Sequence, residues 1–294
     1  MLFKRSKIVL PIVIIFLLAG VIIIFHRKVQ TWKKFDSQNA YNNVKYQLEL
    51  GPRTMGSTAH EKTAEWIIDR LTNLQWQVEI QQTTISGQSV KNIIVKRGSG
   101  SPWIILASHY DSRSIAGRDP DPNKRKQPVP GANDGASTVA ILLELARVIP
   151  SKTDKQIWLV FFDNEDNGND SGEGWDIGAQ YFVSTLKGKP DATVVLDMLG
   201  DKIFDIYMEK NSDAQINSEI WGVAKNLVYT QFIPTYKYSM IDDHIPFLNA
   251  GIRAVDIIDF DYPYWHTTQD TLDKISAGSL KAVGDTILTW LQTY

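Results

Sequence analysis

The sequence of 294 residues contains no cysteine. Disulfide bonds and thiolate sites are therefore excluded, and any bound metal ion must be held by histidine and carboxylate side chains. The absence of cysteine does not decide the compartment, because proteins outside the cytoplasm need not carry disulfides.

An excess of positive charge is also lacking. The chain carries 31 Lys and Arg against 33 Asp and Glu, which gives a net charge of -2. Without a basic surplus to neutralise phosphates, the composition argues against nucleic acid as a partner. The apolar content of 43% is typical of a globular protein, and the sequence shows no internal repeat and no second folded domain.

One long apolar run stands near the N-terminus. Residues 8–25 are 18 consecutive residues without a charge, and a helix of this length would span roughly 27 Å, close to the hydrocarbon thickness of a bilayer. No small-residue cleavage site follows Phe25, so we expect an uncleaved signal anchor over residues 1–29. Basic residues before the run predict a single-pass membrane protein whose folded part lies outside the cytoplasm.

The remaining chain is predicted to form a polar, helical connector over residues 30–50 and one folded domain over residues 51–294. Continuous apolar runs predict buried strands, and segments with apolar residues at helical spacing alternate with them. This alternation favours an α/β domain with a largely parallel sheet. The central strands are expected at 103–107, 156–162, 193–196 and 254–258, with helices at 58–74, 137–148, 177–186, 217–228 and 279–292.

Histidine and carboxylate side chains stand at the ends of these predicted elements. Asp134 lies in the small-residue loop 131–137, directly before an apolar helix. The others are His109, Glu165, Asp166, Asp197 and His266. Singly, each has an ordinary structural explanation, such as a turn or a hydrogen-bonded core residue. Together they predict a zinc site, because ligands gather beyond the carboxyl ends of strands in open α/β sheets.

The same residues, in this order, carry a family resemblance. Together with Gly-Ala-Asn-Asp-Gly-Ala (131–136) and His-Thr-x-x-Asp-Thr (266–271), they resemble the zinc aminopeptidases of metallopeptidase family 28. They are also similar to the related animal-type glutaminyl-peptide cyclotransferases. The resemblance runs from about residue 50 to 292. It implies a three-layer α/β/α sandwich around a mixed, mostly parallel sheet, and a zinc-dependent catalytic domain that acts on peptide N-termini.

The aminopeptidase resemblance implies two zinc ions bridged by Asp134. The other ligands would be His109 and Asp197 on one ion, and Asp166 and His266 on the other. Glu165 would be the general base that takes a proton from a metal-bound water, whose pKa zinc lowers to about 7.

The cyclotransferase resemblance implies one zinc ion, held by Asp134, Asp166 and His266. An N-terminal glutamine would then cyclise through its own amine and release ammonia. Glu165 would carry the proton from the amine to the ammonia, supported by a chain of acids that matches Glu165, Asp197 and Asp242.

Several residues discriminate between the two reactions. Asp242, within Ile-Asp-Asp-His-Ile-Pro-Phe-Leu, looks like the cyclotransferases, and aminopeptidases more often carry serine there. Trp265 and Trp175 are expected to line the substrate side chain, although both could be core aromatics. The 131–136 and 266–271 motifs are closer to the peptidases, and Asp166 departs from the usual glutamate.

We therefore expect glutaminyl cyclisation, with aminopeptidase hydrolysis as the alternative and a non-enzymatic binding module as a third class. His244 is expected to hydrogen-bond Asp197 or Asp242 rather than to bind metal.

Overall fold

The computed structural model describes residues 32–167 and 174–294. Its centre is a six-stranded sheet with the order β1-β2-β4-β3-β5-β8. The strands are β1 (Gln77–Ile85), β2 (Gln88–Arg97), β3 (Trp103–His109), β4 (Gln156–Phe162), β5 (Ala192–Asp197) and β8 (Ala254–Ile258). β4, β3, β5 and β8 run parallel, whereas β1 and β2 form an antiparallel hairpin that joins β4 in the opposite direction. The predicted mixed, mostly parallel sheet is confirmed.

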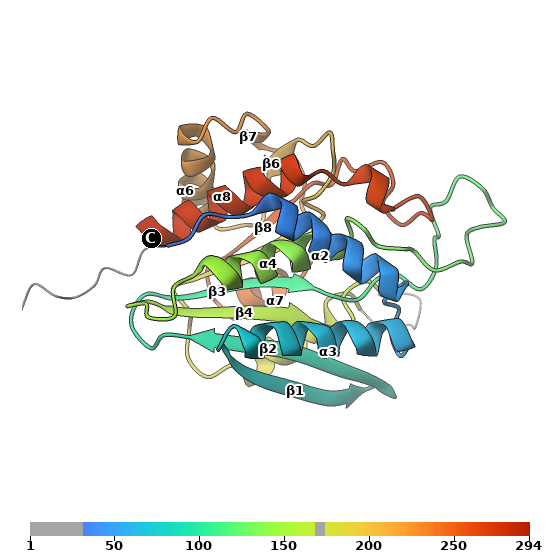
Figure 1. The fold of residues 1–294 in the computed structure, drawn as a ribbon, viewed down its shortest axis with the longest axis horizontal. Coiled ribbons are helices and arrows are strands. Elements are labelled where there is room, and N and C mark those ends of the chain that lie inside the picture. Colours follow the sequence, from blue (N-terminus) through green and yellow to red (C-terminus); the bar gives the residue numbers. More distant parts are fainter. Residues whose placement is uncertain (1–31, 168–173) are drawn as a thin grey trace, which may run out of the picture. The chain divides into compact units, whose positions relative to one another are not determined.

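Helices cover both faces of this sheet. Alternate residues of β3 point to opposite sides, so Ile104 and Leu106 belong to one apolar core and Ile105 and Ala107 to the other. The first face carries α2 (Ser37–Leu50), α3 (Thr58–Asn73), α4 (Ala136–Val148), α6 (Ala214–Asn226) and α8 (Ala277–Thr293), and the second carries α5 (Ile177–Thr185) and α7 (Ile245–Asn249). Figure 1 shows α2, α3, α4 and α8 lying in front of the strands. The layers match the predicted α/β/α arrangement.

A second, two-stranded sheet packs beside α6. It consists of β6 (Ile206–Met208) and β7 (Phe232–Tyr236), which run parallel. β7 is not among the predicted elements. Only Phe232 of β7 is buried, so the strand lacks the apolar pattern that would mark it in the sequence.

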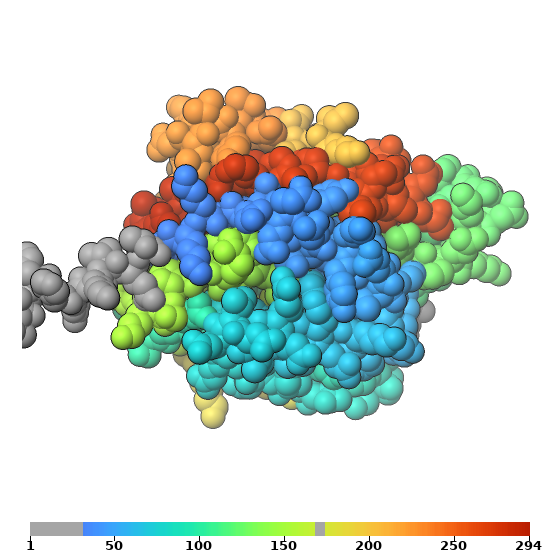
Figure 2. Space-filling model, in the orientation of Figure 1, coloured from blue at the N-terminus to red at the C-terminus, as the bar shows by residue number. Residues whose placement is uncertain are grey.

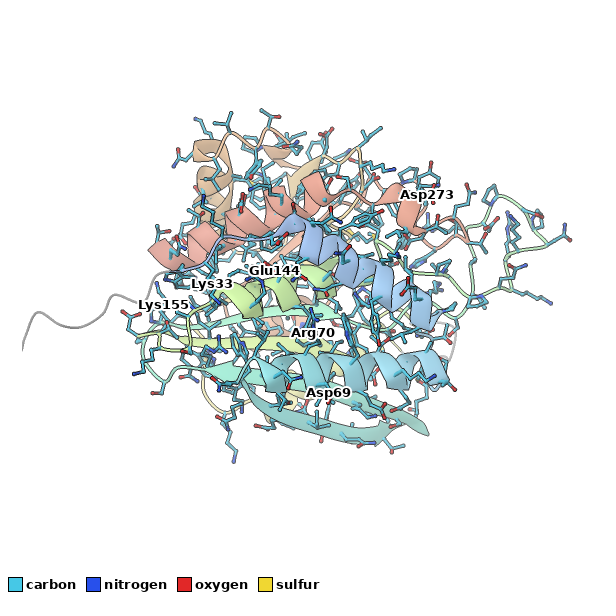
Figure 3. The ribbon with its side chains drawn as sticks, in the orientation of Figure 1. Lys33, Asp69, Arg70, Glu144, Lys155 and Asp273 are labelled. Carbon is cyan, nitrogen blue, oxygen red and sulfur yellow. The ribbon has the colours of Figure 1, made fainter. Side chains whose placement is uncertain are left out.

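Helix α2 belongs to the folded domain, although the sequence suggests a connector over residues 30–50. Asp36 caps α2 through the backbone N–H groups of Gln38 and Asn39, and Ala40 and Val44 are fully buried. Glu144 on α4, which lies beneath α2 in Figure 3, accepts hydrogen bonds from Asp36 N (2.8 Å) and Asn39 Nδ2 (2.5 Å). Figure 2 shows α2 lying against α8. The compact unit therefore begins at Trp32 rather than at residue 51.

The predicted membrane segment lies outside the described residues. Among residues 32–167 and 174–294, no helix combines the length and the apolar character that crossing a bilayer requires.

Candidate active site

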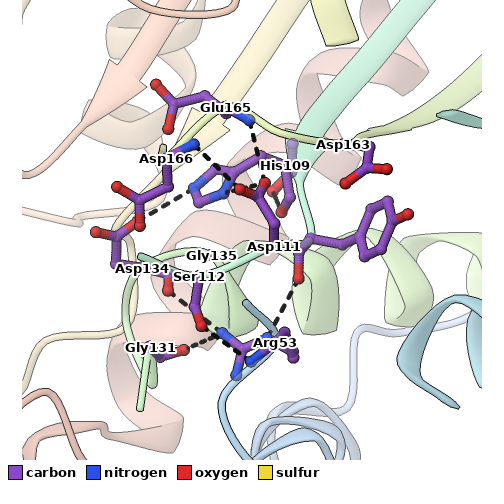
Figure 4. Close-up of polar contacts among 12 residues, drawn as sticks. Arg53, His109, Asp111, Ser112, Gly131, Asp134, Gly135, Asp163, Glu165 and Asp166 are labelled. Atoms are coloured by element: carbon purple, nitrogen blue, oxygen red, sulfur yellow. Dashed lines mark hydrogen bonds and ion pairs between the residues drawn. The ribbon is translucent and has the colours of Figure 1, made fainter. Parts of the chain in front are cut away.

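The predicted site residues converge at one edge of the sheet. His109 and Asp197 are the last residues of β3 and β5, and Glu165 and Asp166 lie on the loop that follows β4. Because these strands are parallel, their carboxyl ends meet at the same edge. Asp134 reaches this edge from the loop before α4, and His266 from the loop after β8; Figure 4 shows part of this arrangement.

Two groups of metal-ligating atoms form there. In the first, His109 Nε2 lies 3.2 Å from Asp134 Oδ1 and 3.1 Å from Asp197 Oδ1. In the second, His266 Nε2 lies 3.0 Å from Asp166 Oδ1 and 3.7 Å from Asp134 Oδ2. The donor atoms within each group all lie within 4.8 Å of one another, and all five residues are buried. Asp134 therefore directs one carboxylate oxygen to each group.

The donor set fits zinc. Imidazole nitrogen and carboxylate oxygen are proper zinc ligands. Asp134 Oδ2 and Asp166 Oδ2 are buried without a hydrogen-bond donor in the described part of the protein. An unpaired buried carboxylate oxygen is costly, and a cation in the second group, between Asp134, Asp166 and His266, would satisfy these two oxygens.

A cavity of about 330 Å³ opens above these groups. Aromatic side chains form part of its wall. The ring of Trp175 stacks on the imidazole of His266 with the centroids 6.1 Å apart, and the ring centroid of Trp265 lies 3.9 Å from that of the same imidazole. Both tryptophans therefore line this cavity, and their contact with a substrate side chain stays a prediction. Phe260 adds a third aromatic surface.

Carboxyl groups line the floor of the same cavity. Burial raises the pKa of Glu165 well above its usual value, with the His109 charge opposing this shift and Asp242 adding to it. Burial, and then the charge of Asp197, likewise raise the pKa of Asp242. Glu165, Asp197 and Asp242 therefore form a cluster of acids that can hold and exchange protons beside the metal groups.

Comparison with known proteins identifies the family. The model of Peptidase family M28 matches residues 92–291. The chain belongs to peptidase family M28. It is 29% identical over 289 residues to a glutaminyl-peptide cyclotransferase of Drosophila melanogaster. This alignment covers 80% of this chain and 77% of the relative.

The solved structures similar to this chain include proteins named as glutaminyl cyclases and proteins named as aminopeptidases. A glutaminyl cyclase from Bacteroides thetaiotaomicron, bound to N-acetylhistamine, superposes with a TM-score of 0.85 at 30% identity, covering 90% of this chain and 100% of that one. A leucine aminopeptidase precursor from the same organism gives a TM-score of 0.84 at 30% identity and the same coverage. The protein is thus a zinc-dependent M28 enzyme, and this places it outside the class of non-enzymatic binding modules.

Asp111 organises the M28 site, and no role for it was predicted from the sequence. Its fully buried carboxylate accepts the backbone N–H groups of Glu165 (3.2 Å) and Asp166 (3.1 Å) and the side-chain amide of Asn167 (3.2 Å). It also lies 3.4 Å from His109 Nδ1, opposite the nitrogen that faces the ligand group. Burial alone would raise the pKa of Asp111, but the facing His109 imidazole, the charge of His60 and the backbone N–H of Asp166 together lower that pKa. Asp111 thereby joins His109 to the loop that carries Glu165 and Asp166 (Figure 4).

Two further buried residues hold the Asp134 loop of this M28 site. Arg53 donates to the carbonyl oxygens of Tyr110 (3.2 Å), Pro130 (2.9 Å), Gly131 (2.5 Å) and Asp134 (3.3 Å). From the other side, Asp270 accepts the backbone N–H groups of Asn133 (2.8 Å) and Asp134 (3.2 Å). Asp270 is the aspartate of the His-Thr-x-x-Asp-Thr motif (266–271), and this position is the sequence signal for its role. Arg53 offers no comparable signal.

Proposed function

We propose that the protein is a glutaminyl-peptide cyclotransferase, which converts an N-terminal glutamine into pyroglutamate with release of ammonia. The observation that carries this proposal is the buried Asp242, which lines the cavity together with Glu165 and Asp197. Cyclisation must move a proton from the attacking amine to the departing ammonia. A set of adjacent acids with raised pKa values is suited to that transfer, whereas simple hydrolysis requires only one base.

In this proposal the substrate's α-amine attacks the carbonyl carbon of its own side-chain amide. A bond forms between the amine nitrogen and that carbon, the bond to the amide nitrogen breaks, and ammonia leaves. Glu165 takes the proton from the amine and returns it to the leaving nitrogen, while Asp197 and Asp242 stabilise the protonated carboxyl. Zinc held by Asp134, Asp166 and His266 would supply a Lewis acid that polarises the amide. Trp175 and Trp265 would enclose the glutamine side chain.

The test is a comparison of two peptides. The purified, zinc-loaded protein is incubated with a Gln-initiated peptide and, separately, with a Leu-initiated peptide, and both products are measured by mass. We expect the Gln-initiated peptide to lose one ammonia and the Leu-initiated peptide to stay intact. Removal of a whole residue from the Leu-initiated peptide, without ammonia loss from the other, would reject cyclisation.

Aminopeptidase hydrolysis is the second candidate, and one observation favours it. Asp134 presents one oxygen to each ligand group, which is the arrangement that two bridged metal ions require. In this alternative, Glu165 would take a proton from the attacking water. Zinc content distinguishes the two schemes at the cavity, because the cyclotransferase needs one ion there and the aminopeptidase two.

We also propose that residues 8–25 anchor the enzyme in a membrane, with the catalytic domain outside the cytoplasm. The support is the uncharged apolar run and the basic residues before it. The protein should then remain in the membrane fraction after a high-salt wash, and protease added outside the cell should cleave the domain. Release by salt alone would contradict an anchor.

A further inference from the structure

The loop that joins β3 to α4 carries exposed positive charge. It extends from the edge of the domain (green in Figure 1), and its exposed cations are Arg118, Lys124, Arg125 and Lys126. Among residues 32–167 and 174–294, no carboxylate forms an ion pair with any of these four side chains. By contrast, Lys237 and Lys274 are paired with Asp261 and Asp273. The loop therefore presents positive charge that the described part of the chain does not neutralise.

Arg118 places one of these charges at the cavity wall. Its guanidinium carbon lies 4.0 Å from the ring centroid of Trp265, which lines the cavity. Its backbone N–H donates to the carbonyl oxygen of His266 (3.1 Å). Stacking on an indole occupies the flat face of a guanidinium and leaves the N–H donors at its edge available to a carboxylate. Arg118 can therefore support Trp265 and bind an anion at the same time.

The next residue fixes the loop in this position. The buried carboxylate of Asp119 accepts the backbone N–H (2.9 Å) and the hydroxyl (2.6 Å) of Thr268, two positions after His266. The carbonyl oxygen of Asp119 accepts Arg125 Nε (2.8 Å). Because these contacts tie the loop to the segment that carries His266, the backbone of Arg118 is already held beside the cavity before a substrate binds. Such preorganisation lowers the entropy that binding costs.

We propose that this basic edge, made of Arg118 and residues 124–126, selects peptides whose second and third residues are acidic. The inference rests on the proposed function only in that the cavity takes a peptide N-terminus, and it holds for either reaction. With the first residue in the cavity, each further residue advances the chain by about 3.3–3.6 Å, so the next side chains lie at the rim. A carboxylate there binds the guanidinium of Arg118, while Lys124 and Lys126 attract the peptide at longer range.

The test compares acidic and neutral peptides of the same length. The full-length, zinc-loaded protein is assayed for ammonia release from two peptides that begin with Gln-Glu-Glu or Gln-Gln-Gln and are otherwise identical. We expect kcat/KM to be about fivefold higher for the acidic peptide at about 0.01 M salt, which is the upper range for one exposed ion pair. The preference should weaken at about 0.15 M salt, because the Debye length falls from about 30 Å to about 8 Å.

Matched variants separate anion binding from support of the wall. Arg118→Gln removes the charge, and Arg118→Lys keeps it. Lys187→Gln is the control, because it removes the same charge from an exposed residue before β5, at the edge of the sheet opposite the cavity. We expect Arg118→Gln to treat the two peptides alike through a loss on the acidic one, and the other two variants to keep the preference.

The outcomes that overturn the proposal are distinct from failure of the proposed function. Equal kcat/KM values for the two peptides in the wild type overturn it, as does an Arg118→Gln protein that loses activity on both peptides equally, since that pattern indicates support of Trp265 alone. Absence of ammonia release from both peptides rejects cyclisation instead. The same comparison then uses peptides that begin with Leu-Glu-Glu and Leu-Gln-Gln, with removal of the first residue as the readout.

Discussion

The substitution Asp111→Asn tests how the base is positioned. Asparagine has almost the same shape but replaces one acceptor oxygen with an NH₂ group. In place of Oδ1, that group would face the backbone N–H of Glu165 and His109 Nδ1; in place of Oδ2, it would face the backbone N–H of Asp166 and the Asn167 amide. In each orientation a donor meets a donor, so at least one hydrogen bond to a charged acceptor is lost. Such a bond contributes about 1.5–3 kcal/mol.

The expected kinetic effect follows from this value. A loss of this size from transition-state stabilisation corresponds to a decrease in kcat/KM of roughly 10–100-fold, at about 1.4 kcal/mol for each factor of ten. Removal of a carboxylate that orients a metal-ligating histidine typically has an effect of the same size, about 10–100-fold. We therefore expect Asp111→Asn to retain its fold and to lose one to two orders of magnitude in activity.

The assay measures kcat/KM on the Gln-initiated peptide, together with zinc content. Asp213→Asn is the matched control: Asp213 also accepts two backbone N–H groups, from Gln215 (3.1 Å) and Ile216 (2.9 Å), but it does so at the start of α6, remote from the cavity. The control should keep wild-type activity. An Asp111→Asn protein with kcat/KM within about twofold of the wild type would refute the positioning role.

Four other predictions follow from the site and its supports. Glu165→Gln should lower kcat by about 10²–10⁴-fold while zinc content is unchanged, because the base is not a ligand; unchanged kcat would exclude Glu165 as the base. Asp242→Ser should abolish most ammonia release from the Gln-initiated peptide if the enzyme is a cyclotransferase, whereas unchanged removal of a residue from the Leu-initiated peptide would favour the aminopeptidase. Burial, and then the charge of Asp201, raise the pKa of Asp259 to about 8. The protonated carboxyl therefore contributes stability below its unfolded pKa of about 4 that is lost as the pH rises to about 8. Asp259→Asn should accordingly raise Tm more above pH 8 than near pH 4, and equal shifts would contradict this. Arg53→Met should lower the free energy of unfolding in urea by about 2–4 kcal/mol, since it leaves buried carbonyl oxygens unpaired; a change below about 0.5 kcal/mol would show that water replaces the guanidinium.

The strands and their terminal ligands could be read from the sequence because local pattern determines them. β3, β4 and β5 are largely buried, so each appears as a mostly apolar run with a polar residue at or just after its end, and in β8 the apolar run is interrupted by Asp256. His109 and Asp197 were identified in this way. Parallel topology then places the strand ends together, whatever the details of the packing.

The supporting residues could not be found in the same way, because their partners are distant in the sequence. Arg53 bonds to carbonyl oxygens that lie 57 to 81 positions away, and no local pattern marks them. In the sequence, Asp111 looks like an ordinary polar residue after a strand. Its role is visible only in the folded protein, where the loop that carries Glu165 lies against it. Helix α2 has only a narrow apolar face, so its polar composition conceals that Ala40 and Val44 belong to the core.

The separation of the ligands along the chain has a consequence for how the enzyme matures. His109 and His266 lie 157 positions apart (266 − 109), and Asp134 needs partners from both ends of this interval. During synthesis, the group around His266 cannot close until β8 and the loop after it have left the ribosome and folded. The group around His266 is therefore completed late in maturation, and a chain truncated before His266 would lack that centre. Zinc retention thus reports the integrity of the whole domain.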